Sequence, residues 1–446
     1  MGKVAGLAHI VRRAPQLAKT HSASILSIGV RGITVLAGFA IALLIGAKLG
    51  AEALGVYALI TQTAMFLSIV AVGGLDLSIV RYFPVLDTER RYSRRSLVNM
   101  LAICLAISVG IALVVFSFGP HYLALFDEVE AGTFYLTILS LIFLSRAFTR
   151  TTSAFLRSQR LYVFSQVVEG LLIPIPVLAL IALGWISTVE AILLATALTG
   201  LGALLIGALS SVRLTSRDKE ALTTGMRALF VGALPLWGVA IVKNFSDWYS
   251  LTVVGSQLSV ADAGLYRLAW QITSALPIIT VGIFGVFSPQ IGTAAARGAT
   301  VDVAKLARTA TRLSVALALP AILFVAALSP FILEFVGPEF HEAQTALLIL
   351  LAGQMIYVVT GPSGIVLAIM GKQVVNLYFA IAAFGLLLFT IPLAALHYGL
   401  NGVAFAIAIV TSLQNIGTFL AVRLLLGIQV WTGSYHDPRT AQGASR

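Results

Sequence analysis

Charged residues are scarce in this sequence. Only 11% of its 446 residues are Asp, Glu, Lys or Arg, whereas a soluble domain averages about 25%. With 59% hydrophobic residues and a mean hydropathy of +0.98, the chain would not stay dissolved unless lipid were its solvent. The composition therefore predicts a protein that crosses a membrane many times.

Cysteine and the motifs of soluble enzymes are also lacking. The single cysteine, Cys104, excludes an internal disulfide framework and a cysteine-based metal cluster, and its apolar neighbours favour a packing role. Gly371 and Lys372 lack the glycine spacing of a P-loop, so ATP hydrolysis is not indicated. The histidines show no paired-ligand spacing, so no resident cofactor or metal is expected. A polytopic enzyme acting on lipid-linked sugars stays open as an alternative, although the longest predicted outer loop, 119–132, is short for one.

Twelve apolar segments are long enough to cross a bilayer as helices, which takes about 20 residues each. A β-barrel would show short alternating strands instead, so we predict an all-α fold. The first segment is too long for a signal-peptide core and is expected to be retained. The segments are approximately 24–47, 54–80, 97–118, 133–155, 163–183, 189–210, 228–254, 263–289, 313–335, 345–370, 375–396 and 402–426.

The distribution of lysine and arginine predicts the orientation. With the N-terminus in the cytoplasm, the inner loops and both termini hold all but four of the 29 basic residues. Lys48 and Arg267 fall outside, and Arg31 and Lys243 fall within helices. This is the positive-inside pattern, and it places both termini in the cytoplasm. The basic charge is spread over loops, so it does not form a face for nucleic acid.

The first and seventh predicted helices are followed by similar stretches. GAKLGAEALGVYALITQ begins at Gly46 and GSQLSVADAGLYRLAWQ begins at Gly255, and six of their 17 positions are identical at a constant offset of 209 residues (255 − 46). Six spans return the chain to its starting side, so the two halves share one orientation. Parallel repeats are a transporter architecture with the substrate site between the halves.

We therefore predict two six-helix lobes around a central cavity. The predicted parts are a cytoplasmic arm (1–23), an N-lobe (24–212), a cytoplasmic linker (213–227), a C-lobe (228–427) and a cytoplasmic tail (428–446).

In each of the two repeated stretches a glycine lies two residues before a tyrosine (Gly55 and Tyr57, Gly264 and Tyr266). These stretches resemble the opening signature of the multidrug/oligosaccharidyl-lipid/polysaccharide (MOP) exporter superfamily. Three further stretches resemble polysaccharide flippases, and the similarity covers nearly the whole chain. They are FVGPEFHEAQTALLILLAGQMIYVV from Phe335, VLAIMGKQ from Val366 and GLNGVAFAIAIVTSLQN from Gly399. Many members of that family have more spans than the twelve predicted here.

The resemblance implies alternating-access movement of an undecaprenyl-diphosphate-linked saccharide from the cytoplasmic to the outer leaflet of a bacterial inner membrane. The product would be a surface polysaccharide such as O-antigen or exopolysaccharide, with glycosyltransferases and a polymerase as partners. A cation-coupled multidrug exporter of the same superfamily stays open as an alternative.

A lipid diphosphate is an anion, so its recognition needs cationic donors. A charged residue at the centre of a spanning helix costs about 2.5–3.5 kcal/mol, which makes each one a functional candidate. Arg31 and Lys243 lie in the equivalent first and seventh helices. Two alternatives stay open: Arg31 snorkels to the inner headgroups, and Lys243 snorkels outward or pairs with Asp247 one turn on.

Three arginines of the fourth helix, Arg146, Arg150 and Arg157, are spaced to lie on one helical face. Because an arginine fork matches phosphate oxygens, we predict that Arg31, Arg146 and Arg150 bind the diphosphate. Lys243 adds a cation from the second lobe. Arg81 is a weaker member of this set, which positive-inside anchoring alone would explain. Arg157 is expected at the interface, and an interfacial position stays open for Arg150.

Asp76, Glu169 and Asp247 are the acids expected within spans. Asp76 is expected to compensate nearby arginines. Glu169 either pairs with Arg31 or Arg146 in the absence of substrate or takes a proton. Pro174 and Pro176 follow it and should kink the fifth helix.

The resemblance also implies a candidate sodium site in the second lobe, as in some lipid II flippases and drug exporters of the superfamily. The residues that would supply oxygen ligands are Asn244, Asp247, Asn376, Thr411 and Asn415. The eleventh predicted helix carries no carboxylate, so coupling to either Na⁺ or H⁺ stays open.

Overall fold

The computed structural model describes residues 2–82, 94–126, 132–215 and 226–436. Within these residues the chain is helical, apart from short connections and one antiparallel bridge between Ile428 and Tyr435. The elements are α1 (Gly2–Val72), α2 (Leu75–Tyr82), α3 (Arg94–Leu123), α4 (Thr133–Ser158), α5 (Tyr162–Gln166), η1 (Val167–Leu171), α6 (Pro174–Ala182), α7 (Val189–Leu214), α8 (Met226–Gln257), α9 (Val260–Ala275), α10 (Pro277–Ala296), α11 (Thr300–Val336), η2 (Pro338–Ala343), α12 (Gln344–Thr360), α13 (Ser363–Ile369) and α14 (Gln373–Leu426). The all-α class predicted from the sequence is confirmed.

The helices are long and apolar enough for a multi-pass membrane protein. Among the described residues, seven candidate spans meet that criterion, or eight if the bent pair Tyr162–Leu171 and Pro174–Ala182 counts as one. α1 and α14 each hold two predicted spans, joined where Gly50 (φ 88°) and Gly399 (φ 58°) leave the helical conformation. The helices are thus compatible with the twelve predicted spans.

Large apolar side chains cover the outer surfaces of these helices. Phe118, Phe335 and Phe389 each expose at least 67% of their surface. Water would make such exposure unfavourable over so many residues, whereas lipid tails make it neutral. The exposed apolar surface is therefore the surface expected to face lipid.

The fifth predicted helix is broken as its prolines predict. α5 runs into the π-helical turn η1, and α6 begins at Pro174 at an angle of 43° to the preceding pair of elements. Pro174 and Pro176 lack the amide hydrogens that would continue the helical ladder, so the break falls just before them. The π-helical turn holds Glu169.

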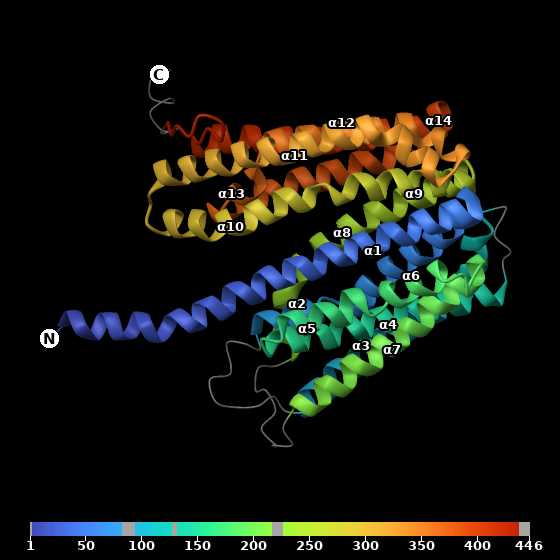
Figure 1. The fold of residues 1–446 in the computed structure, drawn as a ribbon, viewed down its shortest axis with the longest axis horizontal. Coiled ribbons are helices and arrows are strands. Elements are labelled where there is room, and N and C mark those ends of the chain that lie inside the picture. Colours follow the sequence, from blue (N-terminus) through green and yellow to red (C-terminus); the bar gives the residue numbers. More distant parts are fainter. Residues whose placement is uncertain (1, 83–93, 127–131, 216–225, 437–446) are drawn as a thin grey trace. The chain divides into compact units, whose positions relative to one another are not determined.

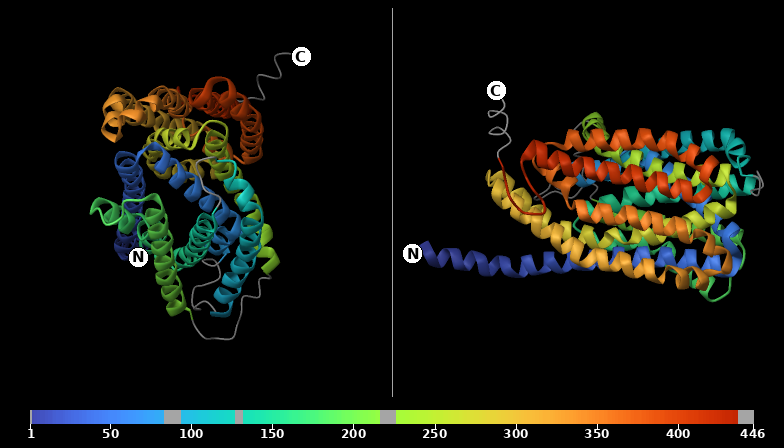
Figure 2. Two further views of the ribbon diagram at one scale, coloured as in Figure 1. Left: turned by 90° about the vertical axis from the view of Figure 1, so that its right-hand side faces the viewer. Right: turned by 90° about the horizontal axis from the view of Figure 1, so that it is seen from above.

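The chain forms two compact units. Unit 1 comprises 1–41, 60–124 and 129–241, and unit 2 comprises 42–59, 125–128 and 242–446. In unit 1, α4 packs against α2, α3 and α7; in unit 2, α11 packs on α12 and α12 on α14 (Figures 1 and 2). The predicted lobe boundaries stay a prediction, and most of the predicted linker lies outside the described residues.

Within unit 2, the two copies of the repeated stretch cross each other. A β-carbon added to Gly55 would lie 1.9 Å from the carbonyl oxygen of Val260, and one added to Gly264 would lie 1.9 Å from that of Ala51. Gly264 and Val260 are the residues 209 positions after Gly55 and Ala51, so the contact is reciprocal. Only glycine allows two helices to approach this closely, which gives the repeated glycine a structural reason.

Candidate functional site

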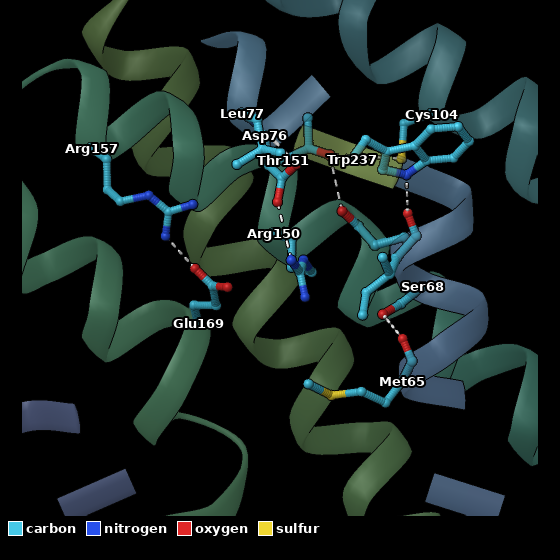
Figure 3. Close-up of polar contacts among 12 residues, drawn as sticks. Met65, Ser68, Asp76, Leu77, Cys104, Arg150, Thr151, Arg157, Glu169 and Trp237 are labelled. Carbon is cyan, nitrogen blue, oxygen red and sulfur yellow. Dashed lines mark hydrogen bonds and ion pairs between the residues drawn. The ribbon is translucent and has the colours of Figure 1, made fainter. Parts of the chain in front are cut away.

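The arginines of α4 face polar or polarizable partners inside unit 1. Arg146, Arg150 and Arg157 are all partly exposed, and each reaches a different neighbouring element. Figure 3 shows the contacts of Arg150 and Arg157. The helix places them on one face because their spacings of four and seven residues are close to one and two turns. The shared face predicted for these arginines therefore exists, and its arginines contact residues of α1, α2 and η1.

Arg150 forms an ion pair with Asp76 of α2. Its Nη2 atom lies 3.1 Å from Asp76 Oδ2, and the two side chains expose 23% and 9% of their surface. Asp76 sits in the first turn of α2, where the positive end of the helix dipole favours a carboxylate. Its other oxygen accepts the backbone N–H of Leu77 at 3.0 Å. Asp76 thus compensates an arginine, as the sequence predicts.

A double glycine positions Asp76. Gly73 and Gly74 both have positive φ angles, 59° and 76°, and they turn the chain between α1 and α2. Just before this turn, the indole N–H of Trp237 donates to the carbonyl of Ile69 at 2.9 Å (Figure 3). This bond holds the end of α1 against α8 and so fixes where α2 begins.

Glu169 pairs with Arg157. The Arg157 Nη1 atom donates to Glu169 Oε2, and the two side chains expose 24% and 30% of their surface (Figure 3). The sequence predicts pairing for Glu169 but names Arg31 or Arg146 as partner, whereas the structure has Arg157. Arg157 is therefore more than an interfacial residue, because it neutralises the carboxylate of η1.

Arg31 lies about one turn before the residue of α1 that contacts η1. A β-carbon added to Gly170 would lie 2.7 Å from Thr34 Oγ1, so α1 and η1 are in close contact there. Arg31 precedes Thr34 by three residues and therefore lies on the same helical face. Its side chain is exposed and forms no ion pair with any described residue.

The other predicted cations are placed as follows. Arg146 Nη1 lies 3.9 Å from the sulfur of Met65, a weak acceptor. Arg81 belongs to α2, but its side chain lies outside the described residues. Lys243 is an exposed residue of α8 in unit 2, within electrostatic range of Asp247, which also faces Arg267. The Lys243–Asp247 pairing expected at this spacing is thus compatible with the structure.

The predicted sodium ligands are brought together only in part. Asn376 and Asn415 line one cavity of unit 2, of about 330 Å³, to which Asp247 does not contribute. Thr411, one turn before Asn415, donates its hydroxyl to the carbonyl of Ile407 at 2.7 Å. The described residues contain no group of three or more His, Cys, Asp and Glu that could hold a metal ion.

Sequence reasoning missed three polar residues of this cavity, Gln414, Thr418 and Tyr357. The adjacent amides Gln414 and Asn415 in an otherwise apolar helix are the signal that could have found the first. Nothing in the sequence pairs Tyr357 with them, because it lies on a different helix.

Comparison with known proteins assigns the architecture. A family model described as polysaccharide biosynthesis protein matches residues 22–295. No curated protein matches the chain in sequence.

Several solved structures share the fold. The lipid II flippase MurJ in an inward closed conformation has a TM-score of 0.73 at 13% identity, covering 90% of this chain and 87% of its own. An inward-facing multidrug resistance MATE transporter of the MOP superfamily has a TM-score of 0.69 at 16% identity, covering 88% and 94%. A MOP superfamily transporter from Pyrococcus furiosus, described as having a binding pocket of reversed polarity, has a TM-score of 0.62 at 16% identity, covering 90% and 94%.

Proposed function

Because the chain belongs to the polysaccharide biosynthesis protein family, we propose that it carries an undecaprenyl-diphosphate-linked saccharide from the cytoplasmic to the outer leaflet of a bacterial inner membrane. The family and the fold make the chain a multi-pass flippase of the MOP superfamily, and not an enzyme. The lipid-linked substrate, the inner membrane, the cytoplasmic termini and an alternating-access cycle belong to the proposal. Glycosyltransferases that build the saccharide and a polymerase that consumes it are the proposed partners.

The paired arginines of unit 1 are the observation that carries this proposal. Arg150 and Arg157 are held by Asp76 and Glu169, while Arg31 is exposed on the adjoining face of α1. A guanidinium group binds phosphate oxygens through two parallel hydrogen bonds, and a site of low dielectric strengthens them. A surface that presents several arginines within one unit therefore suits a diphosphate.

The carboxylates give the site a resting state. An arginine left unpaired in a lipid-embedded site is unfavourable, so Asp76 and Glu169 stabilise the arginines when no substrate is bound. A diphosphate carries more than one negative charge and competes with each single carboxylate. When the diphosphate leaves, the carboxylates pair with the arginines again, so binding is reversible at either side of the membrane.

The same pairing disfavours a cationic drug as substrate. Asp76 and Glu169 are each already bound to an arginine. A cation would have to displace an arginine from its carboxylate and leave that arginine unpaired. The anionic lipid is therefore favoured over the multidrug-exporter alternative.

Reconstitution in liposomes tests the proposal. The purified protein is given a fluorescent lipid-diphosphate saccharide and, in parallel, a cationic dye, under imposed Na⁺ or H⁺ gradients that report the coupling ion. We expect lipid movement and no dye movement. Dye export without lipid movement would show that the proposed substrate is wrong.

Two variants connect the transport to the site. Arg31→Ala and Arg150→Ala should each lower lipid movement by about tenfold or more, because hydrogen bonds to charged groups contribute about 1.5–3 kcal/mol. Arg213→Ala is the matched control, since Arg213 is an exposed residue in the last turn of α7. Equal rates for all three variants would remove the arginines from the mechanism.

A further inference from the structure

The cavity of unit 2 is built from the second repeat alone. It has a volume of about 330 Å³ and lies among α10, α12, α13 and α14. Its polar wall consists of Tyr357, Asn376, Gln414, Asn415 and Thr418. None of its lining residues is charged.

A break in the helix opens the cavity. α12 ends at Thr360, Gly361 has a φ of 64°, and α13 begins at Ser363. At membrane depth, non-helical backbone is tolerated only where it is buried in protein or lines a cavity. Gly364, in the first turn of α13, also leaves space, because a β-carbon there would lie 3.2 Å from Asn376 Oδ1. The glycine therefore leaves room for the Asn376 side chain, and both residues line the cavity.

Three amides of the cavity lack partners in the protein. The side chains of Asn376, Gln414 and Asn415 are partly buried and make no hydrogen bond to any described residue. By contrast, the neighbouring Thr418 hydroxyl donates to the carbonyl of Asn415 at 2.9 Å. Because all three side chains line the cavity and are only partly buried, their amide groups can hydrogen-bond a ligand that enters it.

The chemistry of the wall indicates the ligand. Each amide offers both a donor and an acceptor, which is what a hydroxyl group needs, and an uncharged wall suits an uncharged ligand. The rings of Phe284 and Tyr357 add an apolar surface for C–H groups. A ligand with hydroxyls on its edge and C–H groups on its faces is a sugar ring.

Size argues against a bare cation. Hard cations are held by several oxygens in direct contact at about 2.3–2.6 Å, which requires a tight cage and usually carboxylates. A water molecule takes up about 30 Å³, so this cavity is an order of magnitude larger than one coordination position. We propose that it binds an uncharged sugar unit of the transported saccharide. This inference rests on the proposed function and assigns the sugar, as distinct from the diphosphate, to unit 2.

Transport of two lipids by the full-length protein in liposomes tests the inference. One lipid diphosphate carries the saccharide and the other carries none. Asn376→Leu together with Asn415→Leu removes two amides at nearly constant volume. We expect movement of the saccharide lipid to fall about tenfold, because two amides that hydrogen-bond the sugar are lost, with movement of the bare lipid unchanged. Asn401→Leu is the matched control, because Asn401 is an exposed residue of α14 outside the cavity.

The outcomes separate this inference from the proposed function. If the double variant lowers the movement of both lipids equally, the amides are structural. If it removes a dependence of transport on sodium, the amides bind the cation. Either result overturns the sugar site. If the unmodified protein moves neither lipid, the proposed function fails instead. The sugar site is then judged by saturation-transfer NMR of the protein in nanodiscs with a panel of neutral methyl pyranosides. Binding that the double variant loses supports the site, and no binding overturns it.

Discussion

Glu339 caps the helix that begins at Ala51, although the two residues are 288 positions apart in the chain. Glu339 Oε1 accepts the backbone N–H of Ala51 at 2.8 Å. In the second repeat the cap is local, because Ser259 accepts the N–H of Asp262 at 2.9 Å. The residue equivalent to Ser259 is Gly50 (259 − 209), which has no side chain to offer. The carboxylate of η2 therefore replaces the missing cap.

Removing this cap should destabilise unit 2. Glu339→Ala is expected to lower the free energy of unfolding by about 0.5–2 kcal/mol, as loss of an N-terminal cap does elsewhere. Glu339→Gln keeps an acceptor oxygen and should lose less. Chemical unfolding in detergent micelles measures both. Glu334→Ala is the control, since Glu334 is an exposed residue of α11, and a similar loss there would mean that the cap contributes nothing.

The reciprocal glycines should tolerate no side chain. Gly55→Ala and Gly264→Ala each push a methyl group into a backbone carbonyl that cannot move aside easily, and overpacking of this kind costs about 1–3 kcal/mol or more. Gly285→Ala is the matched control within unit 2, because nothing lies within 4 Å of its added β-carbon. Alanine raises helix propensity by up to about 1 kcal/mol, so this control should be neutral or stabilising. Equal melting temperatures for the three variants would contradict the close crossing.

Variants of the Arg150–Asp76 pair distinguish an effect on the stability of the protein from an effect on lipid transport. Arg150→Gln leaves Asp76 charged with only 9% of its side chain exposed, and should lower the free energy of unfolding by about 1–3 kcal/mol. Adding Asp76→Asn removes the second charge, so the double variant should regain most of that stability. Lipid movement should stay low in the double variant, because the cation that binds phosphate is still missing. A double variant that moves lipid as fast as the unmodified protein would make the pair purely structural.

Much of the fold follows from the sequence because lipid imposes strong constraints. Apolar length predicts the helices, and the prolines at 174 and 176 predict the broken fifth helix that the structure has. The spacing of Arg146, Arg150 and Arg157 predicts one shared face. What spacing cannot predict is which neighbouring helix covers that face.

The partner of Glu169 illustrates this limit. Its π-helical turn rotates the side chain relative to an ordinary helix, and the close contact of Thr34 with Gly170 sets where α1 crosses it. Neither feature has a clear sequence signal, so the sequence alone does not identify Arg157 as the partner of Glu169. Glu339 is similar, since no local pattern connects a residue of η2 to a helix that begins 288 residues earlier.

Gly361 should be the most sensitive residue at the wall of the unit 2 cavity. Its φ of 64° already disfavours a side chain, and a β-carbon there would also lie 2.2 Å from Thr311 Oγ1. Gly371 has a φ of 77° but nothing within 4 Å, so it reports the effect of a positive φ without a steric clash. Gly371→Ala should cost about 1–2 kcal/mol from the left-handed backbone alone. Gly361→Ala should cost more, because its ψ of −158° is accessible essentially only to glycine and because of the contact with Thr311. Adding Thr311→Ala should recover the steric part alone. Equal unfolding midpoints for Gly361→Ala and Gly371→Ala would mean that α11 does not pack against the break.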